Sequence, residues 1–261
     1  MKGIQEIKEE LKAASEEELP ALMEFYAQDA RKGVQTALGQ AKKRLERLEQ
    51  EYQRTEAMKA FEHKYEHLGY VCGIDEVGRG PFAGPVVAGA VILPKDCNIL
   101  YINDSKQLSE KKREELYDEI MEKAVAVQVG YASPARIDEI NILQATYEAM
   151  REAVSKLSVT PRILLNDAVT IPGITIPQVP IIKGDARSIS IAAASILAKV
   201  SRDRIMKAYD QQYPQYGFAS HKGYPTKQHK EALEKYGVLP IHRKTFEPVK
   251  SMCFKQMTFD F

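Results

Sequence analysis

The chain has 261 residues, of which 44% are hydrophobic and 28% charged, and its formal net charge is +1. This length is typical of one large domain, or of one domain with an appendage, and the composition suits a globular protein with a substantial core. No run of about 18 apolar residues could span a membrane, and the charged start, MKGIQEIKEE, lacks the apolar centre of a secretory signal. We therefore expect a cytoplasmic protein with no membrane partner.

The distribution of charge and the spacing of the cysteines bear on which ligands the protein could bind. Residues 199–261 hold 12 Lys and Arg against 6 Asp and Glu. This basic stretch could bind a polyanion such as nucleic acid, although a solvent-exposed surface without a partner would have the same composition. Cys72, Cys97 and Cys253 are far apart and form no Cys-x-x-Cys pair, so we expect free thiols and no thiolate metal site.

Residues 5–62 are predicted to be helical. One apolar stripe recurs there at spacings of three and four, through Leu38, Ala41, Leu45, Leu48 and Tyr52. Two or three helices would form an N-terminal extension over residues 1–68. It could contact a substrate or partner, or it could be a helical hairpin packed on the main domain.

The pattern changes near residue 70, where strands are predicted. Residues 70–77 and 85–93 are rich in β-formers and flank a glycine-rich turn, which favours an antiparallel pair. Further strands are predicted at 124–133, 162–169 and 178–184. Helices are predicted at 109–123 with Ser109 as N-cap, at 135–157, at 188–209, and at 226–237 with Gly237 as the stop. This order indicates an α/β fold with a mixed sheet.

Four carboxylates stand beside apolar strands, where an unpaired charge is costly. Asp75 and Glu76 interrupt CGIDEVGRG, Asp167 ends RILLND, and Asp185 follows IIKG. If the strands are neighbours, the four side chains converge and repel one another, so they need a cation at neutral pH. Oxygen ligands select hard ions such as Mg²⁺ or Mn²⁺, and two such ions about 4 Å apart suit in-line attack on a phosphodiester.

The helix after Asp185 carries a second pattern. A small and polar stripe runs through Ser188, Ala192, Ser195, Lys199 and Arg202. Because it starts beside an acid and ends in two cations, it could lie along a phosphate backbone. The exposed face of a partly buried helix is an equal alternative.

Five segments in order resemble the ribonuclease HII family, the bacterial type 2 ribonucleases H. They are GIDEVGRGPFAGPVVAGAV, DSKQLS, LLNDAV, KGDARSISIAAASILAKVSRD and YGFASHKGYPT, and they span roughly residues 70–245. The resemblance implies a ribonuclease H-like fold over 69–261, with a mixed five-stranded sheet flanked by helices and a C-terminal helical region. It also implies endonucleolytic cleavage of the RNA strand of RNA–DNA hybrids, and cutting 5′ of single ribonucleotides in duplex DNA.

The resemblance assigns roles to individual residues. Asp75, Glu76, Asp167 and Asp185 would be the catalytic acids, holding two Mg²⁺ or Mn²⁺ ions. Hydrolysis would leave 5′-phosphate and 3′-hydroxyl ends. The expected substrate-binding residues are Gly78, Arg79, Gly80, Ser105, Lys106, Ser188, Lys199, Arg202 and Tyr224.

Three of these residues would read the substrate's sugar. Gly78 and Gly80 let main-chain groups approach the ribose 2′-hydroxyl, and the family's equivalent of Tyr224 stacks on the neighbouring deoxyribose. His221, His229 and His242 receive no role.

Two features lie outside the matched segments. The N-terminal extension reads as helix, unlike the β-rich extension of ribonuclease HIII, and Gly-Arg-Gly replaces the Gly-Lys-Gly typical of that family. The last residues, Gln256 to Phe261 (QMTFDF), resemble peptides that dock on the bacterial sliding clamp, although a packed or disordered terminus is the alternative. We expect a monomer.

Two other functions are weighed against this enzyme. A non-catalytic nucleic-acid binder would gain nothing from repelling carboxylates near phosphate. A nuclease acting on DNA junctions would not need the Gly-Arg-Gly segment and Tyr224 for ribose selection.

Overall fold

The computed structural model describes residues 2–253 of the chain. The backbone divides into two compact units, of which the first ends at Glu56 and the second begins at Ala57. Each unit has a hydrophobic cluster of its own. The residues just after Ala57, which the sequence pattern placed with the extension, belong to the second unit.

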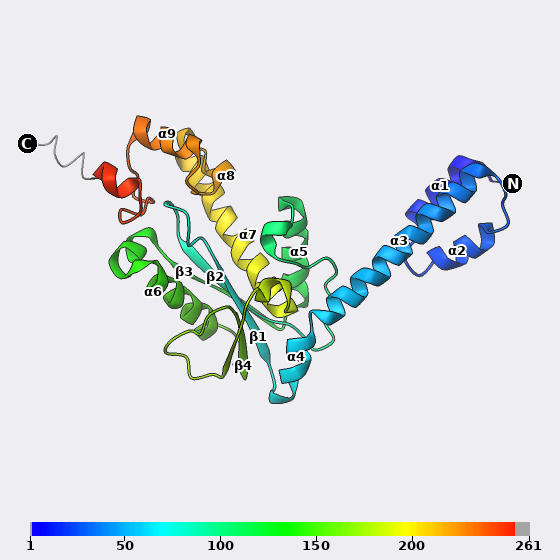
Figure 1. Ribbon diagram of the computed structural model, residues 1–261, viewed down its shortest axis with the longest axis horizontal. Helices are drawn as coiled ribbons and strands as arrows, with labels where there is room; N and C mark the ends of the chain where they lie inside the picture. The colour runs from blue at the N-terminus through cyan, green and yellow to red at the C-terminus, as the bar shows by residue number, and fades with distance from the viewer. Residues whose placement is uncertain (1, 254–261) are drawn as a thin grey trace, which may run out of the picture. The chain divides into compact units, whose positions relative to one another are not determined.

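Three helices form the first unit: α1 (Ile4–Ala13), α2 (Leu19–Tyr26) and α3 (Lys32–Ala57) (Figure 1). Pro20 lies in the first turn of α2, where its missing N–H costs no helical hydrogen bond. Apolar side chains from all three helices pack together, including Leu11, Leu19, Val34 and Ala41. The predicted helices are confirmed.

A five-stranded mixed sheet lies at the centre of the second unit, with strand order β3-β2-β1-β4-β5. The strands are β1 (Val71–Val77), β2 (Val86–Ile92), β3 (Ala126–Ala132), β4 (Ile163–Asp167) and β5 (Gln178–Ile181). β1, β2 and β3 pair antiparallel, whereas β4 runs parallel to β1 and β5 parallel to β4. The predicted mixed sheet and the antiparallel pair at its centre are confirmed.

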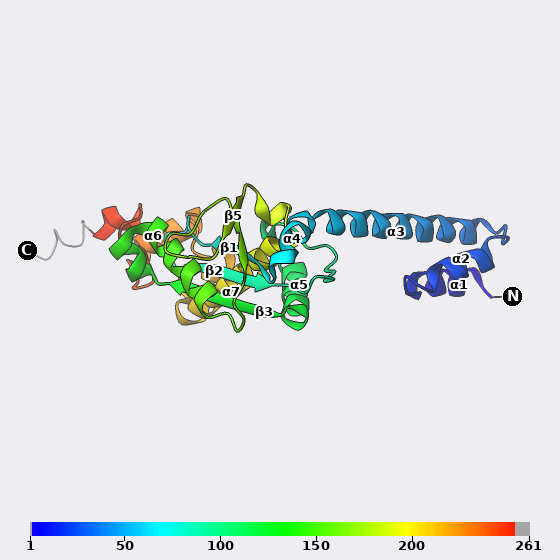
Figure 2. The same cartoon turned by 90° about the horizontal axis from the view of Figure 1, so that it is seen from below.

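Helices cover both faces of this sheet (Figures 1 and 2). α6 (Pro134–Ser155) packs on β3 and β2, and α7 (Ile189–Gln212) packs on β1 and β2 from the other side, next to α5 (Glu110–Lys123). The close approach of α7 depends on Gly73, because a Cβ there would lie 2.1 Å from the carbonyl carbon of Ser190. Any side chain at position 73 would therefore require the backbone of α7 to move.

Short elements complete the second unit. They are α4 (Ala60–Tyr65), α8 (Phe218–His221), α9 (Lys227–Tyr236), and the 3₁₀ helices η1 (Glu66–Leu68), η2 (Ser105–Gln107), η3 (Gly184–Ala186) and η4 (Pro214–Tyr216). Ser109 caps α5 and Gly237 ends α9, as predicted. Sequence periodicity gave no sign of the break in α6 at Asn141, whose φ of 66° is left-handed.

Candidate active site

Strand pairing brings two of the predicted acids together. Ile74 of β1 pairs with Asn166 of β4 in parallel register, so the next residues, Asp75 and Asp167, stand at adjacent positions where the pairing of the two strands ends. Asp185 follows β5 in η3, and its neighbour Gly184 donates a backbone N–H to Asp167 Oδ1 at 2.7 Å. The carboxyl ends of β1 and β4 and the turn after β5 therefore carry Asp75, Asp167 and Asp185 at one edge of the sheet.

Glu76 differs from Asp75 in orientation. Side chains alternate between the two faces of a strand, and Gly73 of β1 faces α7, so Asp75 does too. There it accepts a hydrogen bond from Ser195 of α7. Glu76 starts from the opposite face, and its Oε1 lies 3.3 Å from Arg79 Nη1. This divergence is consistent with another finding: within residues 2–253, no three His, Cys, Asp or Glu side chains are grouped closely enough to hold an ion as they stand.

Burial of three of the acids outweighs the stabilisation that their partners give to the ionised form. Burial raises the pKa of Asp75 well above its ordinary value, and the charge of Glu76 raises it further. Burial is also the main cause of the raised pKa of Glu76 and of Asp185. Carboxylates in this state favour a bound cation. Their all-oxygen donor set fits a hard divalent ion such as Mg²⁺ or Mn²⁺.

A fifth acid, Asp104, lies beside Asp185 and was not predicted. The Asp104 side chain caps η2 by accepting the backbone N–H of Lys106 at 2.9 Å, and its charge raises the pKa of Asp185. The Lys106 ammonium lies 3.9 Å from Asp104 Oδ1 and 3.8 Å from Asp185 Oδ2. The segment DSKQLS begins with this acid, so the sequence holds the signal that would predict it alongside Ser105 and Lys106.

The Gly-Arg-Gly segment lies against the segment that carries Tyr224. A Cβ on Gly80 would be 3.8 Å from Tyr224 Cε1, and Tyr224 is 39% exposed. The Phe82 N–H donates to the Gly223 carbonyl at 3.1 Å and ties the two segments together. Gly78 has a φ of 92° and contacts Arg202 so closely that a Cβ would lie 2.2 Å from Nε.

Arg202 is buried and bonded to the main chain, so the structure gives no support to its predicted role as a phosphate contact. The side chain is fully buried and donates to the carbonyls of Pro85, Lys222 and Ala83 at 2.9, 2.9 and 3.0 Å. Burial lowers the pKa of this guanidinium to about 10. Because this value is still well above 7, the group is charged at neutral pH. Arg202 therefore joins the segment after Gly-Arg-Gly to the segment before Tyr224.

A second arginine, Arg243, which was not predicted from the sequence, also holds the main chain of the Gly-Arg-Gly segment. It is fully buried and donates to the carbonyls of Gly78, Arg79 and Gly84. Two buried guanidinium groups thus hold the main chain of the glycine-rich loop. No periodic pattern marked Arg243 as different from a surface arginine.

Three further residues predicted to contact substrate are also buried or paired within the protein. Ser188 is fully buried, where it caps α7 and donates to Glu62. Ser105 is buried and shares a 2.9 Å hydrogen bond with Ser195. The Lys199 ammonium is paired with Asp203 at 2.6 Å, with only 14% of its side chain exposed. The stripe along α7 is therefore largely buried, and its polar side chains bond neighbouring loops and helices.

Of the cations predicted to contact substrate, Arg79 and Lys106 remain available to do so. Their side chains are 43% and 73% exposed, and each lies beside one of the predicted acids.

The three histidines without a predicted role form a buried cluster beneath Tyr224. His229 Nε2 lies 3.1 Å from His242 Nε2, and His229 Nδ1 lies 3.1 Å from the Tyr224 carbonyl. The His221 ring stacks on His229. Burial lowers the pKa of His229 to about 3 and that of His242 to about 4, so both are neutral at pH 7. They support the Tyr224 segment from within.

Three further predictions concern the cysteines, a membrane span and the C-terminal motif. Cys72, Cys97 and Cys253 are free thiols, as expected. Within residues 2–253 no helix has both the length and the apolar character needed to cross a membrane. The Gln256 to Phe261 motif lies outside the described residues.

Comparison with known families identifies both parts of the chain. A family model described as Ribonuclease HII matches residues 72–249, and a second, described as Ribonuclease HII N-terminal domain, matches residues 3–66. The helical extension, which the motif resemblance left outside the family core, is thus a family feature in its own right.

Individual relatives match over most of their length. Ribonuclease HII of Lachnoclostridium phytofermentans is 61% identical over 93% of this chain and 96% of its own, and that of Enterococcus faecalis is 53% identical over 96% and 98%. The crystal structure of ribonuclease H2 from Pyrococcus horikoshii aligns with a TM-score of 0.61 and 30% identity, over 71% of this chain and 98% of that one. Ribonuclease HII of Archaeoglobus fulgidus, solved in complex with PCNA, aligns with a TM-score of 0.55 and 25% identity, over 68% and 95%.

The fold, the acids at the ends of β1 and β4, and these matches agree: the chain belongs to the ribonuclease HII family and is a ribonuclease H-type endoribonuclease.

Proposed function

We propose that this enzyme uses divalent ions to cut the RNA strand of RNA–DNA hybrids, and to cut 5′ of single ribonucleotides within duplex DNA. The observation that carries the proposal is the parallel register of β1 and β4. It sets Asp75 and Asp167 side by side, and the bond from Gly184 to Asp167 places Asp185 next to them. Excision of ribonucleotides from DNA during replication and repair would be the biological role.

Asp75, Glu76, Asp167 and Asp185 would hold two Mg²⁺ or Mn²⁺ ions. Ions bound there would activate water as the nucleophile and offset the charge that develops on the leaving oxygen. The chain's own contribution is to hold the acids in place. Ser195 and the Glu76 N–H fix the Asp75 carboxylate, and the Gly184 N–H fixes Asp167. Glu76 would have to turn from Arg79 toward the other three acids.

Ribose selection would come from the Gly-Arg-Gly segment together with Tyr224. Gly80 is exposed and presents main-chain groups beside the Tyr224 ring, which is itself partly exposed. Main-chain groups in this position could bond the 2′-hydroxyl, the group that distinguishes RNA from DNA, while the ring stacks on the next sugar. Arg79 and Lys106 are the exposed cations near the acids and would contact phosphates.

We also propose that the C-terminal motif at Gln256 to Phe261 binds the sliding clamp. Two observations support it: the Gln-x-x-hydrophobic-x-Phe pattern, and the existence of the Archaeoglobus fulgidus relative in complex with PCNA. A pull-down of the clamp by wild type and by a variant lacking residues 256–261 tests the motif. Equal capture by both proteins would contradict the proposal.

The reaction is tested with three end-labelled duplexes of one sequence: all DNA, DNA with one ribonucleotide, and an RNA–DNA hybrid. We expect cleavage of the second and third only, with Mg²⁺ or Mn²⁺ present, and a cut 5′ of the single ribonucleotide. Cleavage of the all-DNA duplex would favour a DNA nuclease instead. Binding of all three without cleavage would favour a non-catalytic role.

A further inference from the structure

Helix α7 starts just after the catalytic turn, and its first N–H groups are bonded by a distant part of the chain. A helix leaves its first four N–H groups without partners inside the helix. Here the Ile189 N–H donates to the Met58 carbonyl at 3.1 Å and the Ser190 N–H donates to Glu62 Oε1 at 3.0 Å. The next two N–H groups are bonded by Ser188 itself.

Glu62 is the centre of this contact. Besides the Ser190 N–H, its Oε1 accepts the hydroxyl of Ser188, the N-cap of α7, at 2.5 Å. A carboxylate at this position also interacts favourably with the positive end of the helix dipole. Nearby, the Arg187 guanidinium lies over the Phe61 ring at 5.3 Å. Residues 58–62 thus hold residues 187–190 through backbone, side-chain and ring contacts.

The held residues adjoin Asp185 directly. The N–H groups of Arg187 and Ser188 both donate to the Gly184 carbonyl, at 2.9 and 2.8 Å, which folds η3 onto the start of α7. The Gly184 N–H in turn donates to Asp167. A continuous set of hydrogen bonds therefore runs from Glu62 through the cap of α7 to the turn that carries Asp185, and on to Asp167.

We propose that Glu62 is a positioning residue of the active site, which fixes the Asp185 turn relative to Asp167 by capping α7. This inference rests on the proposed metal role of those acids. Its physical basis is general: groups that orient metal ligands typically change metal affinity or activity by 10–100-fold when they are removed.

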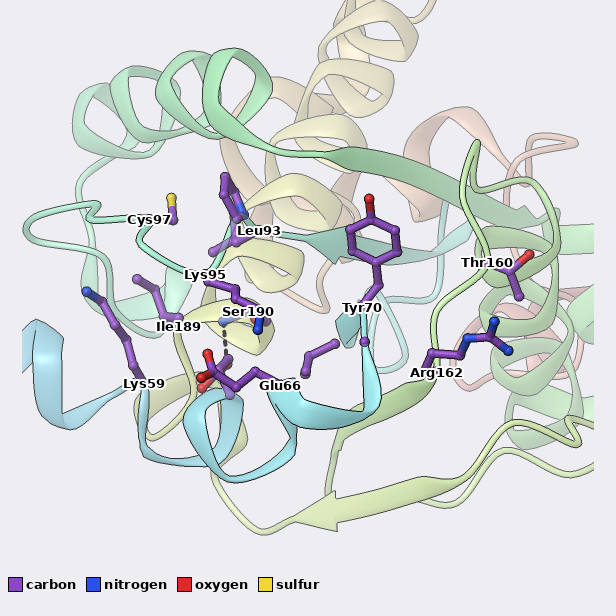
Figure 3. Close-up of a pocket in the computed structure, with 14 residues that line it drawn as sticks. Lys59, Glu66, Tyr70, Leu93, Lys95, Cys97, Thr160, Arg162, Ile189 and Ser190 are labelled. Atoms are coloured by element: carbon purple, nitrogen blue, oxygen red, sulfur yellow. Dashed lines mark hydrogen bonds between the residues drawn. The ribbon is translucent and has the colours of Figure 1, made fainter.

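The surroundings of Glu62 supply a matched control. A cavity of about 380 Å³ lies beside the start of α7, and its lining includes Glu62, Glu66, Ile189 and Ser190 (Figure 3). Glu66 is an acid of the same segment, but within residues 2–253 no hydrogen bond joins its side chain to α7. Glu66→Ala therefore removes a carboxylate from the same cavity without touching the cap.

A conservative variant separates geometry from charge. Glu62 Oε2 is buried and has no hydrogen-bond partner among the described residues. In Glu62→Gln the remaining oxygen can still accept both bonds, but the negative charge is lost and a buried N–H₂ group lacks an acceptor. We expect Glu62→Gln to fall between wild type and Glu62→Ala.

The experiment titrates Mn²⁺ into the full-length protein without nucleic acid and follows free Mn²⁺ by electron paramagnetic resonance. Hydrogen exchange of residues 184–191 is measured on the same samples. We expect Glu62→Ala to bind Mn²⁺ about tenfold more weakly than wild type, with faster exchange at Ser190. We also expect Glu62→Gln to show a smaller shift and Glu66→Ala none.

Faster exchange in Glu62→Ala with an unchanged Mn²⁺ midpoint would overturn the proposal, because the cap would then be purely structural. If Glu62→Ala does not fold, Ser188→Ala removes one donor to the same carboxylate, and an unchanged midpoint there would overturn it equally. Because Mn²⁺ binding is read without substrate, a wild type that binds Mn²⁺ but fails to cut ribonucleotides would refute the proposed function alone.

Discussion

Arg202→Lys tests whether the buried guanidinium is structural or binds phosphate. Arg202 makes three hydrogen bonds to backbone carbonyls from a fully buried position. A lysine ammonium cannot reproduce a planar fork, so we expect at least two of these bonds to be lost. Hydrogen bonds from charged groups contribute about 1.5–3 kcal/mol each, which predicts a loss of roughly 3 kcal/mol or more in the free energy of unfolding.

Urea unfolding measures this loss, and Arg204→Lys is the matched control. Arg204 lies on the same helix, is 48% exposed, and pairs with Glu114 at the surface. A surface ion pair contributes about 0–1 kcal/mol, so the control should change stability little. In a unit of this size, a loss of 3 kcal/mol would lower Tm by roughly 6–12 °C.

The opposite outcome would refute the structural role. If Arg202→Lys were as stable as Arg204→Lys, the guanidinium could not be holding the loop. Arg202→Lys could instead bind duplex more weakly than wild type, with the salt dependence of its binding constant reduced by about one phosphate contact. That result would make the side chain a phosphate ligand, as the sequence pattern indicates.

Other perturbations test the site and its supports. Because the pKa of Asp75 is raised, its ionised form destabilises the fold; this cost is absent below the unfolded pKa of about 3.9 and grows as pH rises. Asp75→Asn should therefore be more stable than wild type in EDTA at pH 8, with a difference that shrinks toward pH 4, and a less stable variant in urea unfolding at pH 8 would contradict this. Mg²⁺ should raise the Tm of wild type but not of Asp75→Asn in thermal scans, and equal shifts would argue against the site. Gly73→Ala should cost about 1–3 kcal/mol or more in urea unfolding, since its Cβ meets helix backbone at 2.1 Å. Gly80→Ala should fold normally and lose cleavage at a single ribonucleotide, and unchanged kcat/KM would exclude that role. The lowered pKa values of His229 and His242 predict stability that is present above about pH 6.5 and lost as pH falls toward 4; a flat urea-unfolding profile between pH 7 and 5 would contradict it.

The acids of the candidate site could be selected from the sequence because of where they lie along the strands. Asp75 and Asp167 each come after an apolar stretch of a strand, and this placement is informative before any pairing is known. The sequence could not show the register that sets them side by side, since pairing depends on β4 running parallel to β1.

The stripe on α7 shows where periodicity is ambiguous. Ser188, Ser195 and Arg202 share a helical face, and small or polar residues there fit either a substrate groove or close packing on a sheet. The structure shows a buried face: Ser188, Ser195 and Arg202 are all buried, and the sheet meets other residues of the helix. Asp104 and Glu62 were missed because each lies in a short element, and their partners are far away in sequence.

The most direct test of the metal centre is anomalous diffraction from a crystal of the full chain soaked in Mn²⁺. We predict two Mn²⁺ peaks at the carboxyl ends of β1 and β4, with carboxylate oxygens of Asp75, Glu76, Asp167 and Asp185 as ligands. Glu76 should have turned from Arg79 toward the ions. Peaks that avoid Asp75 and Asp167, or no peaks while both acids keep their present hydrogen bonds, would contradict the assignment of this edge of the sheet as the metal-dependent active site.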